Sequence, residues 1–317
     1  MKEVIGNTPM IKINYKYKDM IKSVFTKLEY YNLTGSIKDR MANYIITEAL
    51  ENGDLKKEMP IIEATSGNTG IALAALGAYY KHPVYIFMPD WVSKERLNLM
   101  EMFGAKVKLF SKKEGGFKKC IEEAEKLAND INGYLVNQFK NENNLNAHYN
   151  TTGKEILEQI SNVGGFISGI GTGGTLMGTT KRLKEQYPNL ITAAIEPDTM
   201  AIISKGIVDS HKIEGIGDDF IPDLVDVDKI DKIILINDLD AINMARKLAH
   251  DLGLGVGISS GANLIGAIVL NDEIEGNIVT VFADDNKKYL STELKEIIDD
   301  NSCMISNQIE LIDYQII

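Results

Sequence analysis

The stretch PIIEATSGNTGIALAALGAYYKHPVYIFMP, residues 60–89, decides the predicted fold. Its ends, residues 60–65 and 83–89, are short and rich in β-branched or aromatic residues, as buried strands are. Residues 71–82 between them have a helical pattern. A strand, a helix and a second strand in this order predict a parallel sheet covered by helices.

The same alternation continues along the rest of the chain. Further strands are expected at residues 23–31, 105–110, 134–139, 164–170, 190–197, 232–236 and 277–283. Helices are expected at residues 41–53, 94–104, 117–131, 175–187, 240–253 and 262–270. The sequence therefore predicts an α/β protein with mainly parallel sheets and helices on both faces of each sheet.

Length and composition favour two domains and a small-molecule partner. A chain of 317 residues with 44% hydrophobic content can form two medium-sized cores. An Asn-rich stretch, residues 140–150, marks a boundary, which gives an N-terminal domain at 1–145 and a C-terminal domain at 146–317. The 34 basic and 45 acidic residues give a net charge of −11. The sequence has no basic cluster with interleaved aromatic residues, so nucleic acid is not expected as a partner.

Membrane, export and metal signals are absent from the sequence. No apolar run reaches the roughly 18 to 20 residues that span a bilayer. The start MKEVIGNTPMIKI has no signal-peptide core, so a cytoplasmic location is expected. Cys120 and Cys303 lack metal-type spacing and make a poor disulfide framework for a chain of this length. No metal site is predicted.

Two loops that follow predicted strands are candidates for ligand binding, because ligands of open α/β sheets bind at the carboxyl ends of strands. EATSGNTG, residues 63–70, places small and hydroxyl residues at a helix N-terminus, which suits a carboxylate or a phosphate. Ordinary N-capping by Thr or Ser explains the same pattern. The residues alone leave both interpretations open.

The second loop, GIGTGGT at residues 169–175, fits the pattern G-x-G-x-x-G through Gly169, Gly171 and Gly174. Glu196 ends the next predicted strand, as a dinucleotide-binding site would require. Three interpretations compete: a dinucleotide pyrophosphate in an NAD-dependent oxidoreductase, a single phosphate, or a tight turn without a ligand. Threonines on both sides of Gly173 and Gly174 favour one compact phosphate.

A third stretch, NLTGSIKDR at residues 32–40, contains Lys38 after small and hydroxyl residues. Most lysines are solvated surface charges. An amine nucleophile is the alternative, because burial lowers a lysine pKa and an imine with an aldehyde cofactor removes the ammonium charge. Lys38 taken alone does not decide between them.

The three stretches together resemble the β family, or fold-type II, of pyridoxal-phosphate (PLP) enzymes. The likeness is greatest to O-acetylserine sulfhydrylase (cysteine synthase) and to the catalytic core of cystathionine β-synthase. It runs nearly end to end through IGNTPMIKI, LEYYNLTGSIKDR, EATSGNTGIALA, TTGKEI, SGIGTGGTLMG, GIGDDFIP, GISSGAN and YLSTEL. The resemblance implies two three-layer αβα domains of the tryptophan synthase β type, with PLP in the cleft between them, and a homodimer.

The resemblance also implies roles for particular residues. Lys38 would form the internal aldimine and move the substrate Cα proton. Asn68 would hydrogen-bond the ring oxygen of PLP, and Ser259 would face the pyridine nitrogen. The phosphate would be bound by Gly171, Thr172, Gly173, Gly174 and Thr175. The substrate carboxylate would be bound by Thr65, Ser66, Thr69 and Gln138. The resemblance also allows the first strands of the chain to pair with the sheet of the second domain.

The segment EGIGDDFIPD, residues 214–223, is where the sequence departs from these relatives. In the family this loop closes on the site, and Gly215 would lie near the substrate. Asp219 matches an aspartate of cystathionine β-synthases and is expected to be structural. Asp218 fills a position that is usually Ala or an aromatic residue. A carboxylate there could take a proton from water or a thiol, or it could face solvent.

These features predict β-replacement or β-elimination on L-cysteine through an α-aminoacrylate, with release of hydrogen sulfide and addition of water or a thiol. Synthesis of L-cysteine from O-acetylserine and sulfide is the alternative within the same class. A catalytically silent binding partner and an NAD-dependent oxidoreductase are alternatives from other classes.

Overall fold

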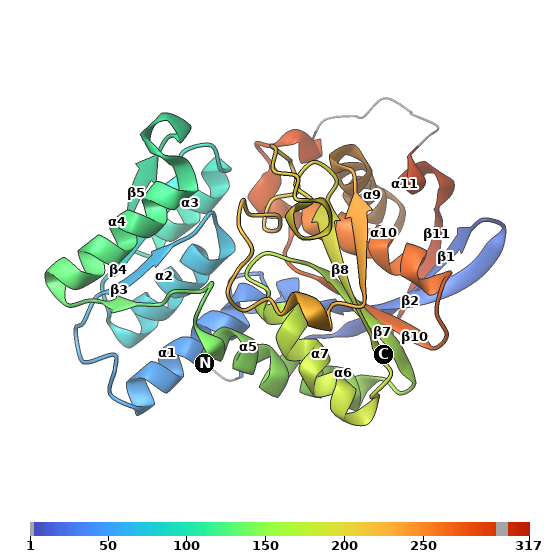
Figure 1. Cartoon of the computed structure of the whole chain (residues 1–317), viewed down its shortest axis with the longest axis horizontal. Coiled ribbons are helices and arrows are strands. Elements are labelled where there is room, and N and C mark those ends of the chain that lie inside the picture. The colour runs from blue at the N-terminus through green and yellow to red at the C-terminus, as the bar shows by residue number, and fades with distance from the viewer. Residues whose placement is uncertain (1–2, 296–303) are drawn as a thin grey trace.

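A computed structural model describes residues 3–295 and 304–317, so Cys303 lies outside the described residues. Within these ranges the strands form a seven-stranded sheet, in the order β11-β1-β2-β10-β7-β8-β9, and a four-stranded sheet, in the order β5-β4-β3-β6. Figure 1 shows the smaller sheet on the left and the larger one on the right.

The smaller sheet and its helices occupy one continuous part of the chain. Its strands are β3 (Ile61–Ala64), β4 (Val84–Pro89), β5 (Lys106–Phe110) and β6 (Tyr134–Leu135). Its helices are α1 (Lys38–Glu51), α2 (Asn68–Tyr80), α3 (Lys94–Met102) and α4 (Gly116–Ile131).

The larger sheet is formed from both ends of the chain. Its strands are β1 (Met10–Tyr17), β2 (Met20–Leu28), β7 (Val163–Gly169), β8 (Ile191–Pro197), β9 (Lys232–Ile236), β10 (Asn277–Phe282) and β11 (Glu310–Ile316). The remaining α-helices are α5 (Glu142–His148), α6 (Lys154–Gln159), α7 (Gly174–Gln186), α8 (Ile202–Lys205), α9 (Asp238–Leu252), α10 (Ile258–Asn271) and α11 (Ile305–Gln308).

Each sheet is the middle layer of three. In the smaller sheet Ile61 and Ile86 pack with α1, α2 and α3, whereas Ile62 and Phe87 face α4. Successive residues of a strand point to opposite faces, so a strand covered on both sides must be apolar throughout. This arrangement confirms the predicted layers and explains why Ile61, Ile62 and Ala64 are all apolar although they point to opposite faces.

The larger sheet follows the same rule. Ile167 and Ile195 pack against α9 and α10, and their neighbours Phe166 and Ala194 pack on the opposite face with residues of α7. Strands β2, β10, β7, β8 and β9 run parallel, and β1 is antiparallel to both of its neighbours, β2 and β11. The mainly parallel α/β architecture is therefore confirmed.

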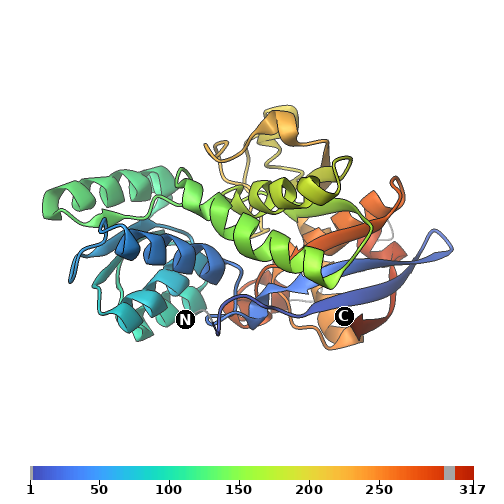
Figure 2. The same ribbon diagram turned by 90° about the horizontal axis from the view of Figure 1, so that it is seen from below.

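The first strands pair inside the larger sheet, next to strands from the other end of the chain. The β1–β2 hairpin lies beside β10 and β11 in both views of the ribbon (Figures 1 and 2). The sequence analysis did not identify β1 or β11. Residues 11–17 alternate apolar and polar side chains, with Ile11, Ile13 and Tyr15 buried, and this period of two was the available signal.

The Asn-rich stretch expected to mark the domain boundary is helical instead. Asn141 caps α5 by accepting a hydrogen bond from the backbone N–H of Asn143 at 3.0 Å. The side chain of Asn144 is buried and bonded within the protein. Helix α5 crosses residue 145, and the division of the chain into 1–145 and 146–317 stays a proposal.

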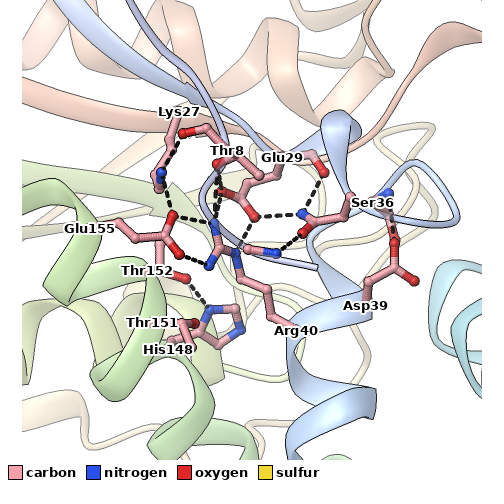
Figure 3. A network of polar contacts seen from close by, with 12 residues as sticks. Thr8, Lys27, Glu29, Ser36, Asp39, Arg40, His148, Thr151, Thr152 and Glu155 are labelled. Carbon is pink, nitrogen blue, oxygen red and sulfur yellow. Dashed lines mark hydrogen bonds and ion pairs between the residues drawn. The ribbon is translucent and has the colours of Figure 1, made fainter. Parts of the chain in front are cut away.

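A buried network of charges connects the beginning of the chain, α1 and α6 (Figure 3). The Arg40 guanidinium forms ion pairs of 2.6 Å with Glu29 and of 2.6 Å with Glu155. Lys27 forms a third pair, at 2.6 Å from Glu155. Burial opposes ionisation of Glu29, but the Arg40 and Lys27 charges and the Thr8 hydroxyl lower the pKa of Glu29 to about 2. The Glu29 and Glu155 carboxylates and the Arg40 guanidinium are thus held in their charged forms, whereas burial lowers the pKa of Lys27.

Replacement of Arg40 should destabilise the fold strongly. Arg40→Met leaves two buried carboxylates without the guanidinium, and loss of one partner from a buried ion network costs about 3–5 kcal/mol. Urea unfolding of parent and variant measures the difference. Lys119→Met, which removes a half-buried surface lysine paired with Glu123, is the control and should leave the midpoint nearly unchanged. Equal midpoints for Arg40→Met and the parent would contradict the prediction.

Candidate active site

A cavity of about 880 Å³ lies between the two sheets. Its wall includes the loops after β3, β6 and β7 and the first turns of α1 and α10. Thirteen of the fourteen predicted site residues line it: Lys38, Thr65, Ser66, Asn68, Thr69, Gln138, Gly171, Thr172, Gly173, Thr175, Gly215, Asp218 and Ser259. Gly174 is buried behind the wall, at the start of α7. The fold thus gathers at one place residues that lie far apart in the sequence.

Lys38 is the first residue of α1 and is held by the loop before it. The carboxylate of Asp39 accepts hydrogen bonds from the backbone N–H and the hydroxyl of Thr34, at 2.8 and 2.7 Å. The backbone N–H of Ile37 donates to the carbonyl of Ala283 at 2.8 Å, which fixes the loop to the end of β10. Lys38 therefore projects from a loop attached to both halves of the molecule.

The surroundings of Lys38 favour the neutral amine. Burial lowers its pKa, and the negative charges of Asp284 and Asp218 only partly oppose that shift. A neutral amine is the nucleophilic form of lysine. The interpretation of Lys38 as a solvated surface charge is therefore not supported by its position.

The loop after β3 presents hydroxyl groups and backbone N–H groups to the cavity. Thr69 donates from its hydroxyl to Gln138 Oε1 at 2.7 Å, and Gln138 Nε2 donates to the carbonyl of Ala64 at 3.0 Å. The Thr65 hydroxyl accepts from the backbone N–H of Gly67 at 3.1 Å. These bonds fix the loop at the N-terminus of the 13-residue helix α2, where a carboxylate is favoured.

Glu63 supports this loop and was missed by the sequence analysis. Its carboxylate is buried and accepts hydrogen bonds from the backbone N–H of Ala64 at 2.7 Å and of Gln138 at 3.0 Å. Burial raises the pKa of Glu63 to about 8, although the backbone donors oppose the shift. A glutamate inside an otherwise apolar strand, in IIEAT, was the signal that could have revealed it.

The loop after β7 approaches other backbone closely, which explains its glycines. Gly173 has φ of +84°, a left-handed conformation that favours glycine. A Cβ at Gly171 would lie 2.6 Å from the carbonyl oxygen of Gly215, and a Cβ at Gly174 would lie 2.0 Å from Asn144 Oδ1. Backbone N–H groups at the start of the 13-residue helix α7 and the hydroxyls of its threonines suit a phosphate there.

Asn144 and His148, from α5, hold the threonines of this loop. Asn144 donates to the hydroxyl of Thr172 at 2.9 Å. His148 Nε2 lies 3.3 Å from the Thr175 hydroxyl, and its Nδ1 lies 2.9 Å from that of Thr152 (Figure 3). Burial and then the charges of Arg40 and Lys38 lower the pKa of His148 to about 3, so the ring is neutral. The sequence analysis missed both residues because it took the Asn-rich stretch for a boundary.

Asn68 contacts a carboxylate that the sequence analysis did not propose. Its Nδ2 donates to Asp284 Oδ2 at 2.7 Å, and the Tyr289 hydroxyl donates to the same oxygen at 2.8 Å. Among the described residues, the Oδ1 atoms of Asn68 and Asp284 are buried and have no partner. A buried unpaired polar atom costs free energy, so this corner of the cavity suits a polar ligand.

Ser259 and Asp218 occupy other parts of the wall. Ser259 is the second residue of α10 and is buried. Asp218 is half-buried, and burial first and the neighbouring Asp219 second raise its pKa to about 6, whereas Lys38 lowers it. Asp219 lies at the rim of the same cavity and is exposed to solvent. Its exposure does not support the structural role expected for it.

The contacts of Glu196 contradict the interpretation of the Gly169–Gly174 pattern as a dinucleotide-binding site. This carboxylate is buried and accepts hydrogen bonds from the backbone N–H groups of Ile203 and Ser204, at 2.7 and 3.0 Å. The Ser204 hydroxyl adds a third bond, at 2.7 Å. Glu196 therefore binds the start of α8 and not a ribose hydroxyl.

A family model described as "Pyridoxal-phosphate dependent enzyme" matches residues 1–284. The chain belongs to this family, and it is a PLP-dependent enzyme of the β-replacement or β-elimination class. Its resemblance to the cysteine synthase family is confirmed. A probable cysteine synthase of Bacillus subtilis (strain 168) is 40% identical over 301 residues, which cover 92% of this chain and 96% of the relative.

Solved structures show the same likeness. A hydrogen sulfide-producing enzyme from Fusobacterium nucleatum superposes with a TM-score of 0.96 and 49% identity, covering 100% of this chain and 97% of that one. A second structure is an aspartate-to-asparagine mutant of the hydrogen sulfide-producing enzyme in complex with an alpha-aminoacrylate intermediate. It gives a TM-score of 0.95 and 49% identity, covering 98% of this chain and 96% of that chain.

The cavity fits PLP. The glycine-rich start of α7 suits the phosphate, the unpaired oxygen pair of Asn68 and Asp284 suits a polar ring substituent, and Lys38 faces the same space. Within residues 3–295 and 304–317, no cluster of three or more metal-ligating side chains occurs and no helix is long and apolar enough to cross a membrane.

Lys38 should be the residue that binds PLP covalently. Borohydride reduction of the PLP-loaded protein should fix the cofactor to one lysine, and peptide mass mapping should identify Lys38. Lys112 and Lys118 also line the cavity and serve as internal controls. An adduct on either of them, or an adduct that survives in Lys38→Ala, would contradict the assignment.

Proposed function

We propose that the enzyme uses L-cysteine as the donor amino acid, releases hydrogen sulfide and adds water or a thiol in its place. The observation that carries this proposal is Asp218, whose carboxylate lines the same cavity as Lys38. An acid with a pKa raised to about 6 is ionised at neutral pH and is also a moderately strong base.

The bound cofactor supplies an electron sink that stabilises negative charge at the substrate Cα. The residues of the chain orient the substrate and move its proton. Thr65, Ser66, Thr69 and the first turn of α2 orient the α-carboxylate, with Gln138 fixed beside them. Lys38, whose pKa is lowered by burial, would take the proton from Cα. Ser259 would offer the cofactor ring a hydroxyl and not a carboxylate, which would leave the ring a weaker electron sink.

Asp218 acts in the second half of the reaction. After the donor has lost its sulfur, a nucleophile must add at Cβ, and water or a thiol adds faster when a base removes its proton. Asp218 is half-buried, and with a pKa of about 6 its carboxylate is mostly ionised at neutral pH and available as a base. The proton passes to the carboxylate as the new bond to Cβ forms.

The relatives support this proposal and one alternative. The Fusobacterium nucleatum enzyme at 49% identity produces hydrogen sulfide by its description. The Bacillus subtilis relative at 40% identity is described as a probable cysteine synthase, which favours the alternative of L-cysteine synthesis from O-acetylserine and sulfide. A homodimer and a cytoplasmic location stay predictions.

Product analysis decides between the two reactions. The PLP-loaded enzyme is incubated with L-cysteine alone and, separately, with O-acetylserine and sulfide. Release of sulfide with formation of L-serine or a thioether from cysteine alone supports the proposal. Formation of L-cysteine from O-acetylserine, without sulfide release from cysteine, would establish the alternative.

Asp218→Asn should slow the reaction while keeping the shape of the site. Loss of one acid–base group costs on the order of 10²–10⁴-fold in rate. The loss should appear in sulfide release and product formation from cysteine, whereas PLP binding measured by absorbance should persist. Sulfide release at the parent rate would show that Asp218 faces solvent and does not act as the base.

The pH dependence of kcat for cysteine turnover should show an acidic limb near pH 6, because Asp218 must be deprotonated to act as a base on the incoming nucleophile. Burial is the main cause of its raised pKa and Asp219 is the second. Asp219→Asn removes that negative charge, so the pKa of Asp218 should fall and the limb should move to lower pH. A limb that stays in place, or moves to higher pH, would contradict this coupling.

A further inference from the structure

Residues 214–220, called here the crossing segment, extend from the larger-sheet side of the cavity to elements of the smaller sheet. At its first end, the carboxylate of Glu214 forms an ion pair with Nη1 of Arg96, on α3. Arg96 is only 2% exposed, and its guanidinium lies 4.8 Å from the ring centroid of Tyr289. A buried arginine needs a carboxylate partner, so this contact is a firm attachment.

The backbone of Gly67 fits closely around Arg96. A Cβ at Gly67 would lie 2.6 Å from Arg96 Cδ, so a larger residue would displace the arginine. Gly67 precedes α2 in the loop that faces the substrate carboxylate. The first attachment of the crossing segment is therefore built into the substrate-binding loop of the smaller half.

The second end is attached through aromatic rings. Phe220 meets Phe139 with ring centroids 5.0 Å apart at an interplanar angle of 68°, and Phe139 meets Phe117 of α4 at 5.8 Å and 72°. Edge-to-face pairs of this kind stabilise contacts beyond the apolar area that they bury. Phe139 directly follows Gln138, so this attachment also lies next to a predicted substrate-binding residue.

Asp218 lies between the two attachments. Gly215 and Gly217 have φ of +96° and +74°, which bend the backbone over the cavity. The backbone N–H of Gly217 donates to the carbonyl of Ile170 at 2.9 Å, and His211 Nε2 lies 2.7 Å from the carbonyl oxygen of Gly217. The middle of the segment thus rests on the loop after β7, while both ends reach the smaller half.

We propose that Arg96, through Glu214, and Phe139, through Phe220, are positioning residues that fasten the crossing segment at both ends and so place the Asp218 carboxylate in the cavity. This inference rests on the proposed function, in which Asp218 is the base. Neither Arg96 nor Phe139 transfers a proton. They restrict the position of the Asp218 carboxylate at the time when the nucleophile enters the cavity.

Both attachments are needed for geometric reasons. Asp218 is four residues from Glu214 and two from Phe220, and a chain spans about 3.3–3.6 Å per residue when extended. Release of either end leaves Gly217, bonded to Ile170 and His211, as the nearest fixed point, so the Asp218 carboxylate can shift about it. A misplacement of about 1 Å can cost on the order of 10²-fold in rate.

The test compares Glu214→Gln and Phe220→Leu with the parent, each loaded with PLP. Glu122→Gln, which removes an exposed carboxylate paired with Lys119, and Phe103→Leu, which alters a partly exposed ring at the end of α3, are the matched controls. Hydrogen exchange of peptides covering residues 214–220 measures the attachment directly. Steady-state release of sulfide from cysteine measures its effect on the reaction.

We expect faster exchange in the crossing segment and a fall in kcat on the order of 10²-fold in both test variants, with a much smaller change in KM. The control variants should match the parent. Phe220→Tyr retains the ring contact and should restore kcat, which a general loss of stability would not predict. Two independent variants keep the test valid if one of them folds poorly.

The outcomes separate the inference from the proposed function. If Asp218→Asn is slow but Glu214→Gln and Phe220→Leu match the parent in exchange and in kcat, the positioning role is overturned and the proposed function stands. If Asp218→Asn releases sulfide at the parent rate, the proposed function fails, and the positioning role fails with it even where exchange in the crossing segment rises.

Discussion

The buried pairing of Arg40 with Glu29 and Glu155 is the constraint on which the site depends. Arg40 lies two residues after Lys38 on α1, Glu29 follows β2 of the larger sheet, and Glu155 belongs to α6. A guanidinium buried among carboxylates tolerates little movement, because separation would leave uncompensated charge in the interior. The network therefore fixes the first turn of α1, and with it Lys38, relative to the strands of the larger sheet.

The same charges influence the chemistry of the site. Arg40 helps burial to keep His148 neutral, and the neutral ring lies between Thr152 and Thr175, which follows β7. Structural and functional contacts are thus continuous from the N-terminal strands, through α1 and α5, to the loop at the start of α7. This continuity explains why site residues from distant parts of the sequence are held in one cavity.

The cavity lies between two separately packed sheets, so contacts across it have a particular importance. The loop before Lys38 is bonded to the end of β10, and the crossing segment contacts Arg96 and Phe139 of the smaller half. Asp218 is carried by that segment and not by a strand or helix. Its position is consequently a property of how the two halves meet, which makes it the part of the site most sensitive to substitutions outside the cavity.

The sequence by itself determined the layered α/β fold, because apolar runs and helical periods are local consequences of burial and backbone geometry. It also indicated Lys38, the 63–70 loop and the 169–175 loop through motifs that recur in one order. Only the tertiary structure decided what surrounds Asp218 and which groups Glu196 and Asn144 bind. Whether a carboxylate faces a cavity, caps a helix or meets water depends on neighbours supplied by distant segments, and no local pattern records them. For the same reason the sequence did not show that the Asn-rich stretch forms α5, whose buried Asn144 and His148 contact the loop after β7.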